Sequence, residues 1–237
     1  MISDNNIIYL NDYTNVKFIR LSLSGDFIKD VTPPSGFRPI NIIGNDQYRV
    51  TMNPHSQKAL FYIWKDKNNY NPIKLPNREF NEEFSNLFRK EGRSTILGNY
   101  LIHLTKYYPN LYIYDLEKKE LIKKIQFDES EIKEGSTTTR PDGAKLMAPP
   151  ARVDILSKDV ATVPAFPNRI FILAEGKSDT RDYDLDKLYE FDIEKEAFVA
   201  THELGVKAKE ITVNDKYLFV YSEEENQIFQ YEIVASE

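Results

Sequence analysis

Residues 99–116, NYLIHLTKYYPNLYIYDL, align without a gap with residues 216–233, KYLFVYSEEENQIFQYEI. Both stretches carry a short polar loop in the middle and end in an aromatic-x-aromatic-acid-aliphatic pattern. A third copy begins at residues 169–173 and ends at residues 188–193, with a longer loop between its halves. Most segments of the chain alternate apolar and polar residues, which is typical of half-buried strands. The repeat therefore predicts a recurring unit of strand, loop, strand, tight turn and strand.

The spacing of the repeat predicts the fold class. The equivalent positions Leu188 and Ile228 lie about 40 residues apart, the period at which a four-stranded antiparallel unit recurs in a β-propeller. One such sheet cannot bury both of its faces, whereas sheets stacked around an axis cover one another. We therefore expect an all-β protein, a propeller of five or six four-stranded antiparallel blades that takes up residues 1–237 as a single domain. A β-sandwich whose hairpins share a motif by chance is the alternative.

Three further segments complete the expected architecture. Apolar residues at helical spacing predict one short helix near residues 78–90. Residues 128–150, rich in Glu, Ser and Thr, read as a long surface loop. The N-terminal hairpin at residues 17–31 resembles outer strands, and residues 210–233 resemble inner strands. We expect the two ends of the chain to complete one sheet and so close the ring.

The composition excludes several classes of function. The chain of 237 residues contains no cysteine, so it has no disulfide, no thiolate zinc site and no cysteine nucleophile. Its formal net charge of −6 disfavours nucleic-acid binding, which needs concentrated positive charge. No window is apolar enough to predict a transmembrane helix, and residues 1–6 do not read as a signal peptide.

The segment from residue 169 to 233 resembles the TolB-like six-bladed β-propeller proteins of Bacteroidetes. The phrases that carry the resemblance are NRIFILAEG, KLYEFDIEKEAFVATHEL and AKEITVNDKYLFVYSEEENQIFQYEI, with KFIRLSLSGDFIKDV near the N-terminus in the same style. The resemblance implies a propeller of the kind found in secreted lipoproteins of unassigned function, and it implies no catalytic residues. It also implies an exported protein, in the periplasm or at the cell surface, if a leader has been removed; otherwise we expect a cytoplasmic one.

The three histidines do not form a metal-binding pattern. His55, His103 and His202 show neither HxH nor HExxH spacing. His55 lies in a turn-like segment and is expected to be exposed. His103 corresponds to Val220 in the repeat, and a position that accepts valine is a packing position.

One acidic loop deserves comparison with calcium sites. Asp182, Asp184 and Asp186 alternate along the chain, as oxygen ligands do in a calcium loop. However, Lys187 stands where an EF-hand loop requires glycine, and Ile193 stands where it requires glutamate. We therefore predict no metal site and no cofactor, with calcium binding by these three aspartates as a minor hypothesis.

Acidic residues also suggest an enzymatic alternative. Asp46, Asp154 and Glu210 lie near the start of candidate inner strands, and five-bladed propellers host glycosidases with paired carboxylates in the axial channel. Nothing in the sequence singles out a catalytic pair, and no G-x-S-x-G motif is present. A glycan-active enzyme with acidic residues at the mouth of the channel is therefore the alternative hypothesis.

The leading hypothesis is a non-catalytic binding or scaffold module. A rigid ring can present loops of variable sequence, here residues 65–71, 106–110 and 177–186, to a protein or carbohydrate partner. A third hypothesis is a subunit of a larger assembly, in which a partner completes a missing part of the ring. The specific ligand-binding residues are not predicted by the sequence.

Overall fold

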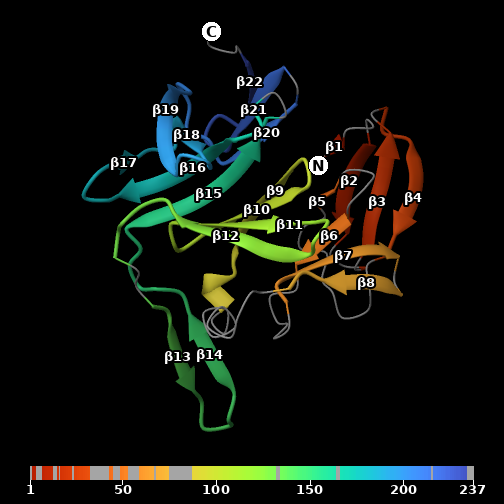
Figure 1. Cartoon of the computed structure of the whole chain (residues 1–237), viewed down its shortest axis with the longest axis horizontal. Coiled ribbons are helices and arrows are strands. Elements are labelled where there is room, and N and C mark those ends of the chain that lie inside the picture. Colours follow the sequence, from red (N-terminus) through yellow and green to blue (C-terminus); the bar gives the residue numbers. More distant parts are fainter. Residues whose placement is uncertain are drawn as a thin grey trace. The chain divides into compact units, whose positions relative to one another are not determined.

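The structure is a computed structural model that describes residues 2–3, 7–12, 15, 17–22, 24–32, 43–44, 49–52, 59–66, 68–74, 87–131, 134–163, 166–214 and 216–233. The described residues form an all-β protein made of small antiparallel sheets (Figure 1). The one helical element among them is a 3₁₀ turn, η1 (Leu87–Arg89). Most of the helix predicted near residues 78–90 lies outside the described residues, and its last residues form this short turn instead of an α-helix.

The chain divides into two compact units, the first comprising residues 1–87 and 114–122. It contains two four-stranded antiparallel sheets, each in sequence order. The first sheet consists of β1 (Ile2–Ser3), β2 (Ile7–Asp12), β3 (Lys17–Ser22) and β4 (Phe27–Val31). The second consists of β5 (Ile43–Gly44), β6 (Arg49–Met52), β7 (Phe61–Asp66) and β8 (Asn69–Pro72). Phe61 and Tyr114, both fully buried, pack edge to face in this unit with ring centroids 5.1 Å apart.

The prediction that the hairpin at residues 17–31 supplies outer strands to the C-terminal sheet is wrong. β3 and β4 pair with each other and β3 pairs with β2, so the hairpin completes its own N-terminal sheet. The short strands β1 and β2, which the alternation did not reveal, supply the other half of that sheet.

The second unit comprises residues 88–113 and 123–237. Its first sheet has the strand order β12-β11-β10-β9. The strands are β9 (Gly92–Leu97), β10 (Tyr100–Thr105), β11 (Asn110–Asp115) and β12 (Glu120–Gln126). Residues 114–122, at the end of β11 and the start of β12, are assigned to the first unit. The next sheet contains β15 (Ile155–Thr162), β16 (Arg169–Lys177), β17 (Asp182–Tyr183), β18 (Lys187–Asp192) and β19 (Ala197–Glu203). The C-terminal sheet has three strands, β20 (Glu210–Val213), β21 (Tyr217–Ser222) and β22 (Gln227–Glu232).

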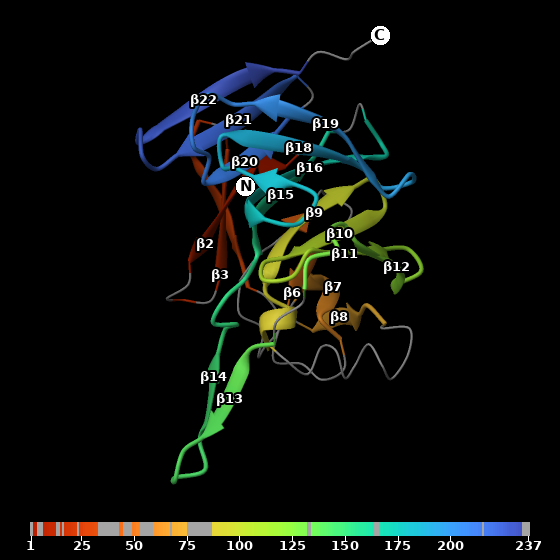
Figure 2. The ribbon, with the colours of Figure 1, turned by 90° about the vertical axis from the view of Figure 1, so that its left-hand side faces the viewer.

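The sheets of the second unit pack through two apolar clusters. One joins the β9–β12 sheet to the β15–β19 sheet and includes Ile113, Ile172 and Phe191. The other joins the β15–β19 sheet to the C-terminal sheet and includes Leu173, Ile211 and Val220. The first strands of the three sheets, β9, β15 and β20, lie side by side (Figure 2). Each sheet therefore covers a face of the next, which removes from water the apolar side that a single sheet would expose.

The structure confirms the sequence repeat. The two gapless copies form the hairpins β10–β11 and β21–β22, and the third forms β16 and β18 with β17 in the longer connection. The acid of the motif has a structural role, because Asp115 and Asp192 each accept two backbone N–H bonds from the turn that follows. These bonds hold the pKa of both carboxyls below the usual range. The prediction that every unit has four strands is wrong, since the sheets contain two to five.

The segment predicted as a long surface loop, residues 128–150, contains an antiparallel hairpin. Its strands are β13 (Ser136–Thr139) and β14 (Lys145–Ala148), and all residues of both strands are exposed. In both ribbon views this hairpin, called the arm below, extends away from the β9–β12 and β15–β19 sheets (Figures 1 and 2).

Candidate functional site

A cluster of charged side chains lies where the first strands of the three sheets of the second unit meet. Arg93 comes from β9, Asp159 from β15 and Glu210 from β20. The Arg93 guanidinium lies 3.1 Å from a Glu210 carboxylate oxygen, and each of these side chains is about half exposed. We call Arg93, Asp159 and Glu210 the first-strand cluster. It places two carboxylates and one permanent cation at one location.

Asp159 is held by the backbone of two neighbouring sheets. A β-bulge between Ser157 and Asp159 shifts the register of β15 against β16, and bulges of this kind redirect a side chain. One Asp159 oxygen accepts the N–H of Val160 at 3.0 Å, and the other accepts the N–H of Ile211 on β20 at 2.9 Å. The carboxylate therefore ties β15 to β20.

Burial dominates the electrostatics of Asp159. Loss of solvent raises the pKa of its carboxyl to about 6, against the lowering effects of the Ile211 amide and the Arg93 charge. The nearby Glu210 charge raises it further. The cluster thus combines a carboxyl that takes up a proton readily with a carboxylate paired to arginine, which is the combination that acid–base chemistry uses.

The sequence predicted part of this cluster. Glu210 begins β20 and Asp154 immediately precedes β15, so both lie at the start of first strands, whereas Asp46 lies outside the described residues. The sequence reasoning missed Asp159, which is the partly buried member. Asp159 could have been noticed as an acidic residue within the otherwise apolar end of a strand. There the bulge interrupts the period-two alternation.

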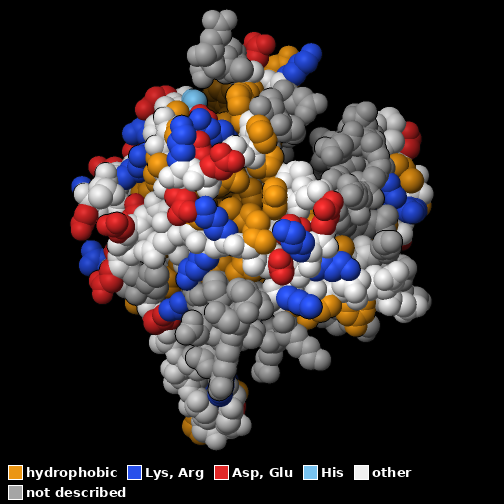
Figure 3. All heavy atoms as spheres, in the orientation of Figure 1, with side chains coloured by type: hydrophobic (Ala, Val, Ile, Leu, Met, Phe, Trp, Pro, Cys, Tyr) orange, Lys and Arg blue, Asp and Glu red, His pale blue; other side chains and the backbone are white. Residues whose placement is uncertain are grey.

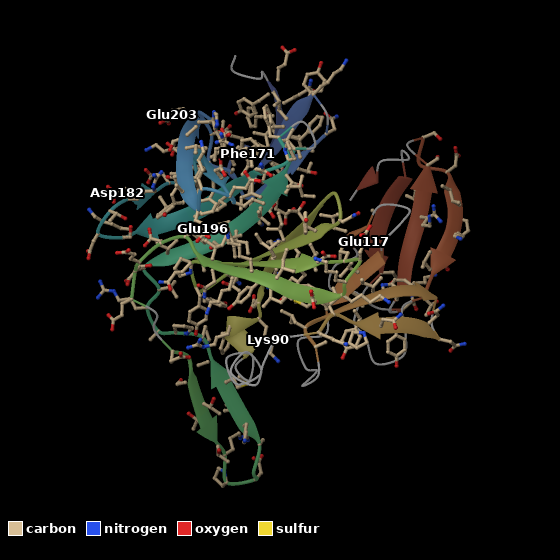
Figure 4. The ribbon with its side chains drawn as sticks, viewed as in Figure 1. Lys90, Glu117, Phe171, Asp182, Glu196 and Glu203 are labelled. Carbon is tan, nitrogen blue, oxygen red and sulfur yellow. The ribbon has the colours of Figure 1, made fainter. Side chains whose placement is uncertain are left out.

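His103 is a core residue, as the repeat predicted. Its ring is fully buried; Nε2 donates to the Lys90 carbonyl at 2.9 Å, and Nδ1 lies 2.7 Å from the Ser94 hydroxyl. Burial lowers the pKa of His103 to about 4, so the ring is neutral near pH 7. Lys90, which directly follows η1 (Figure 4), is also buried, and burial lowers the pKa of its amine. Neither side chain is available to a ligand.

The other two histidines give no sign of a metal site. His202 on β19 is exposed and lies 2.9 Å from a Glu190 carboxylate oxygen. His55, expected in an exposed turn, lies outside the described residues.

Two of the three aspartates of the calcium hypothesis form separate ion pairs. Asp182 lies at the β17 end of its sheet (Figure 4) and pairs with Lys177 at 3.5 Å. Asp184 pairs with Lys187 at 3.1 Å, and one oxygen of Asp186 is buried. Across the part of the chain that the structure describes, no three His, Cys, Asp or Glu side chains are grouped so that they could hold a metal ion.

The loops predicted to face a partner differ in how far they can do so. In residues 106–110, Tyr108, Pro109 and Asn110 are buried, and the Thr105 hydroxyl donates to the Tyr108 carbonyl at 2.7 Å, so this segment is part of the core. Residues 65–71 form strand ends and the turn between β7 and β8. Within residues 177–186, Tyr183 is buried and donates to the Asp128 carboxylate at 2.9 Å.

The arm exposes apolar side chains that the sequence did not single out. Leu146 and Met147 on β14 are 54% and 39% exposed, and their cross-strand neighbours are Thr138 and Thr137. Contacts at its base hold the arm, where Gly135 lies against the Phe88 ring and where Arg89 pairs with Glu134. A two-stranded hairpin without a covering layer is marginally stable, so its exposed apolar residues are a candidate contact surface.

A second exposed apolar region lies on the C-terminal sheet. Figure 3 shows hydrophobic side chains gathered over strands β20–β22. Phe229 and Tyr231 pack toward the cluster shared with the β15–β19 sheet, while Ile228 is 71% exposed.

Among the described residues, no helix is long and apolar enough to cross a membrane.

Comparison with known proteins supports the fold class alone. No protein-family model matches the chain, and no curated protein is similar to it in sequence. Among solved structures it is similar to a chain of Kuenenia stuttgartiensis hydrazine synthase, with a TM-score of 0.51 and 9% identity over 99% of this chain and 83% of that one. It is also similar to U3-55K, with a TM-score of 0.46 and 8% identity over 98% of this chain and 79% of that one. The hydrazine synthase, on which the support for the fold class rests, contains a β-propeller.

Proposed function

We propose that the protein is a non-catalytic binding or scaffold module, built as a β-propeller, that engages a protein partner through the arm. In this proposal the five larger sheets are the blades of one ring. The side-by-side first strands β9, β15 and β20 support it, because inner strands converge in this way in propellers. The resemblance of residues 169–233 to TolB-like propellers of Bacteroidetes also supports it.

The observation that carries the binding role is the exposure of Leu146 and Met147 on the arm. Apolar residues on an uncovered hairpin do not contribute to a core, and they gain free energy when a partner removes them from water. Thr137 and Thr138 lie opposite them on β13, and the charged residues of the arm are Arg140, Asp142 and Lys145 at and beside its turn. A protein surface fits this chemistry better than a glycan, which needs several directed hydrogen bonds.

Arrays of purified proteins and of glycans test the proposal, with wild type compared with Leu146→Asp. We expect one or more protein ligands whose binding weakens by about tenfold or more in the variant, the range of a contact central to an interface. Ile122→Asp is the matched control, because Ile122 on β12 is 46% exposed and is not part of the arm. Binding that Leu146→Asp leaves intact, or binding to glycans alone, would contradict the role of the arm.

The first-strand cluster favours the second candidate, a glycan-active enzyme. A glycosidase uses a pair of carboxyl groups, one of them with a raised pKa; Asp159 has a raised pKa, and Glu210, paired with Arg93, is the second carboxyl of the cluster. However, both Asp159 oxygens already accept backbone N–H bonds, so the group serves the fold and does not face a substrate. On a panel of chromogenic glycosides we expect no turnover. Turnover that Asp159→Asn abolishes would replace the binding role with the enzymatic one.

A further inference from the structure

The C-terminal sheet ends in a strand whose outer edge has no partner among the described residues. β22 pairs with β21 on one side only. In the other two large sheets of the second unit, the strand at the same place in the repeat lies between two others, since β11 is flanked by β10 and β12, and β18 by β16 and β19. Within the described residues, the C-terminal sheet thus has no strand at the place that β12 and β19 occupy in its sister sheets.

The backbone of β22 offers hydrogen bonds at this edge. Ile233 donates its N–H to the Lys216 carbonyl on the β21 side. Because hydrogen-bonded pairs alternate along an antiparallel ladder, the N–H and C=O groups of Ile228, Gln230 and Glu232 point away from β21. Such an edge is a template for another strand.

The two sister outer strands differ in chemistry, since β19 (AFVATHE) has no lysine, and the strand taken here as the guide is β12. β12, the outer strand of the β9–β12 sheet, has the sequence ELIKKIQ, which is amphipathic and basic through Lys123 and Lys124. The Lys124 amine lies 5.8 Å from the centre of the Tyr112 ring on β11, within the range of a cation–π contact. Phe229 on β22 occupies the place of Tyr112 in the gapless repeat. An incoming strand with lysine at this position would reproduce the contact.

The charge around β22 also fits a basic strand. Glu225 in the preceding turn and Glu232 at the end of β22 are exposed and form no ion pair with any described residue. Glu223 and Glu224 are paired with Lys209 and Lys207. A second copy of the chain is disfavoured, because antiparallel β22–β22 pairing brings the unpaired glutamates of two copies to one edge.

We propose that the free edge of β22 accepts a basic, amphipathic strand of a partner protein as the fourth strand of the C-terminal sheet. The added strand bonds to the backbone of Ile228, Gln230 and Glu232 and places lysine near Phe229 and the two glutamates. This surface is separate from the arm, so its test is independent of the proposed function.

A peptide with the sequence of residues 119–127, KELIKKIQF, is the probe, labelled for fluorescence anisotropy. We expect saturable binding to the full chain, weakened about tenfold or more in Gln230→Pro, which removes one outward N–H and is tolerated on an edge strand. Gln230→Ala removes the same side chain but keeps the N–H, and it should bind within about twofold of wild type. Circular dichroism and the melting temperature check that both variants fold.

A second peptide, in which the lysines corresponding to Lys123 and Lys124 are replaced by glutamate, tests the charge argument. We expect its binding to be about tenfold weaker than that of the basic peptide, and binding of the basic peptide to weaken with added salt. Absence of binding, or equal binding by Gln230→Pro, would overturn the proposal. Two further results would overturn it, because each would show that the edge is already occupied. One is dimerisation of the free chain that Gln230→Pro abolishes. The other is slow hydrogen exchange at the Gln230 amide before peptide is added.

Discussion

Two groups of the second unit, the partly buried Asp159 and the fully buried His103, respond to pH in opposite directions. Asp159 prefers to be protonated in the folded state, because burial raises its pKa to about 6. His103 prefers to be neutral, because burial lowers its pKa to about 4. Their effects on stability therefore oppose each other across the same mildly acidic range. The pH dependence of the wild-type free energy of unfolding therefore does not show the contribution of either group alone. Variants of each residue are needed to separate the two contributions.

Replacing Asp159 by asparagine removes one of the two effects. The stability that Asp159 contributes is fully present below its ordinary pKa of 3.8 and is lost as the pH rises to about 6. We expect the free energy of unfolding of Asp159→Asn, relative to wild type, to increase by up to about 3 kcal/mol between about pH 4 and pH 6.5, at about 1.4 kcal/mol per pKa unit. Urea unfolding at several pH values measures this. The exposed Asp182→Asn is the control, and a constant difference from wild type would refute the assignment.

Replacing His103 by glutamine has the opposite consequence. The contribution of His103 is present above its ordinary pKa of 6.5 and is lost as the pH falls toward 4. His103→Gln lacks that loss, so its deficit in unfolding free energy relative to wild type should shrink by up to about 3 kcal/mol over this range. The same urea series provides the measurement. A constant difference between His103→Gln and wild type over this range would show that the ring is not buried.

Single residues differed in how far the sequence could predict them. The burial of His103 was predictable, because the equivalent position in the repeat is Val220, and a strand position occupied by valine is typically packed against the core. Asp159 was not, because a bulge is a local departure from the alternation that the sequence reasoning used. Its environment depends on the Ile211 amide from another sheet, a contact that no local pattern encodes.

At the scale of the element, the motif turns depend on their aspartates. Asp192 is buried, accepts the N–H groups of Glu194 and Lys195 at 3.0 Å each, and lies 3.4 Å from the Arg169 Nε. We expect Asp192→Ala to lower the free energy of unfolding by about 1 to 3 kcal/mol, the range for lost hydrogen bonds to a charged group. Asp192→Asn keeps an acceptor oxygen and should lose less in the same thermal or urea assay. Equal losses in both variants would show that charge, and not the turn bonds, matters.

The elements that the sequence predicted are those with local signals. The hairpins β10–β11 and β21–β22 have alternating apolar residues and short connections, and both were predicted with their ends within a residue or two. The arm was missed because both faces of its strands are exposed, so they show no alternation of apolar and polar residues. β13 consists of serine and threonine alone. In residues 106–110, which were predicted to face a partner, Tyr108, Pro109 and Asn110 are buried. A polar loop sequence does not reveal which of its residues pack into the core.

At the scale of the whole molecule, the account rests on the five larger sheets being blades of one ring. The all-β fold and the stacking within the second unit are established by the structure. The ring itself also requires the N-terminal sheet to stack on the C-terminal sheet. The repeat could predict the blades, because each blade is local in sequence. Closure of a ring would join residues more than 200 positions apart, and local sequence patterns carry no information about such distant contacts.

The distance between spin labels on the first and last sheets tests this claim most directly. The chain contains no cysteine, so Leu10→Cys on β2 and Thr212→Cys on β20 can be labelled without other changes. Lys177→Cys with Thr212→Cys, both within the second unit, is the control and should give one narrow distance. A closed ring predicts for the first pair a single narrow distribution below about 35 Å, since stacked sheets lie about 10 Å apart. A broad distribution, or one centred well beyond that distance, would contradict it.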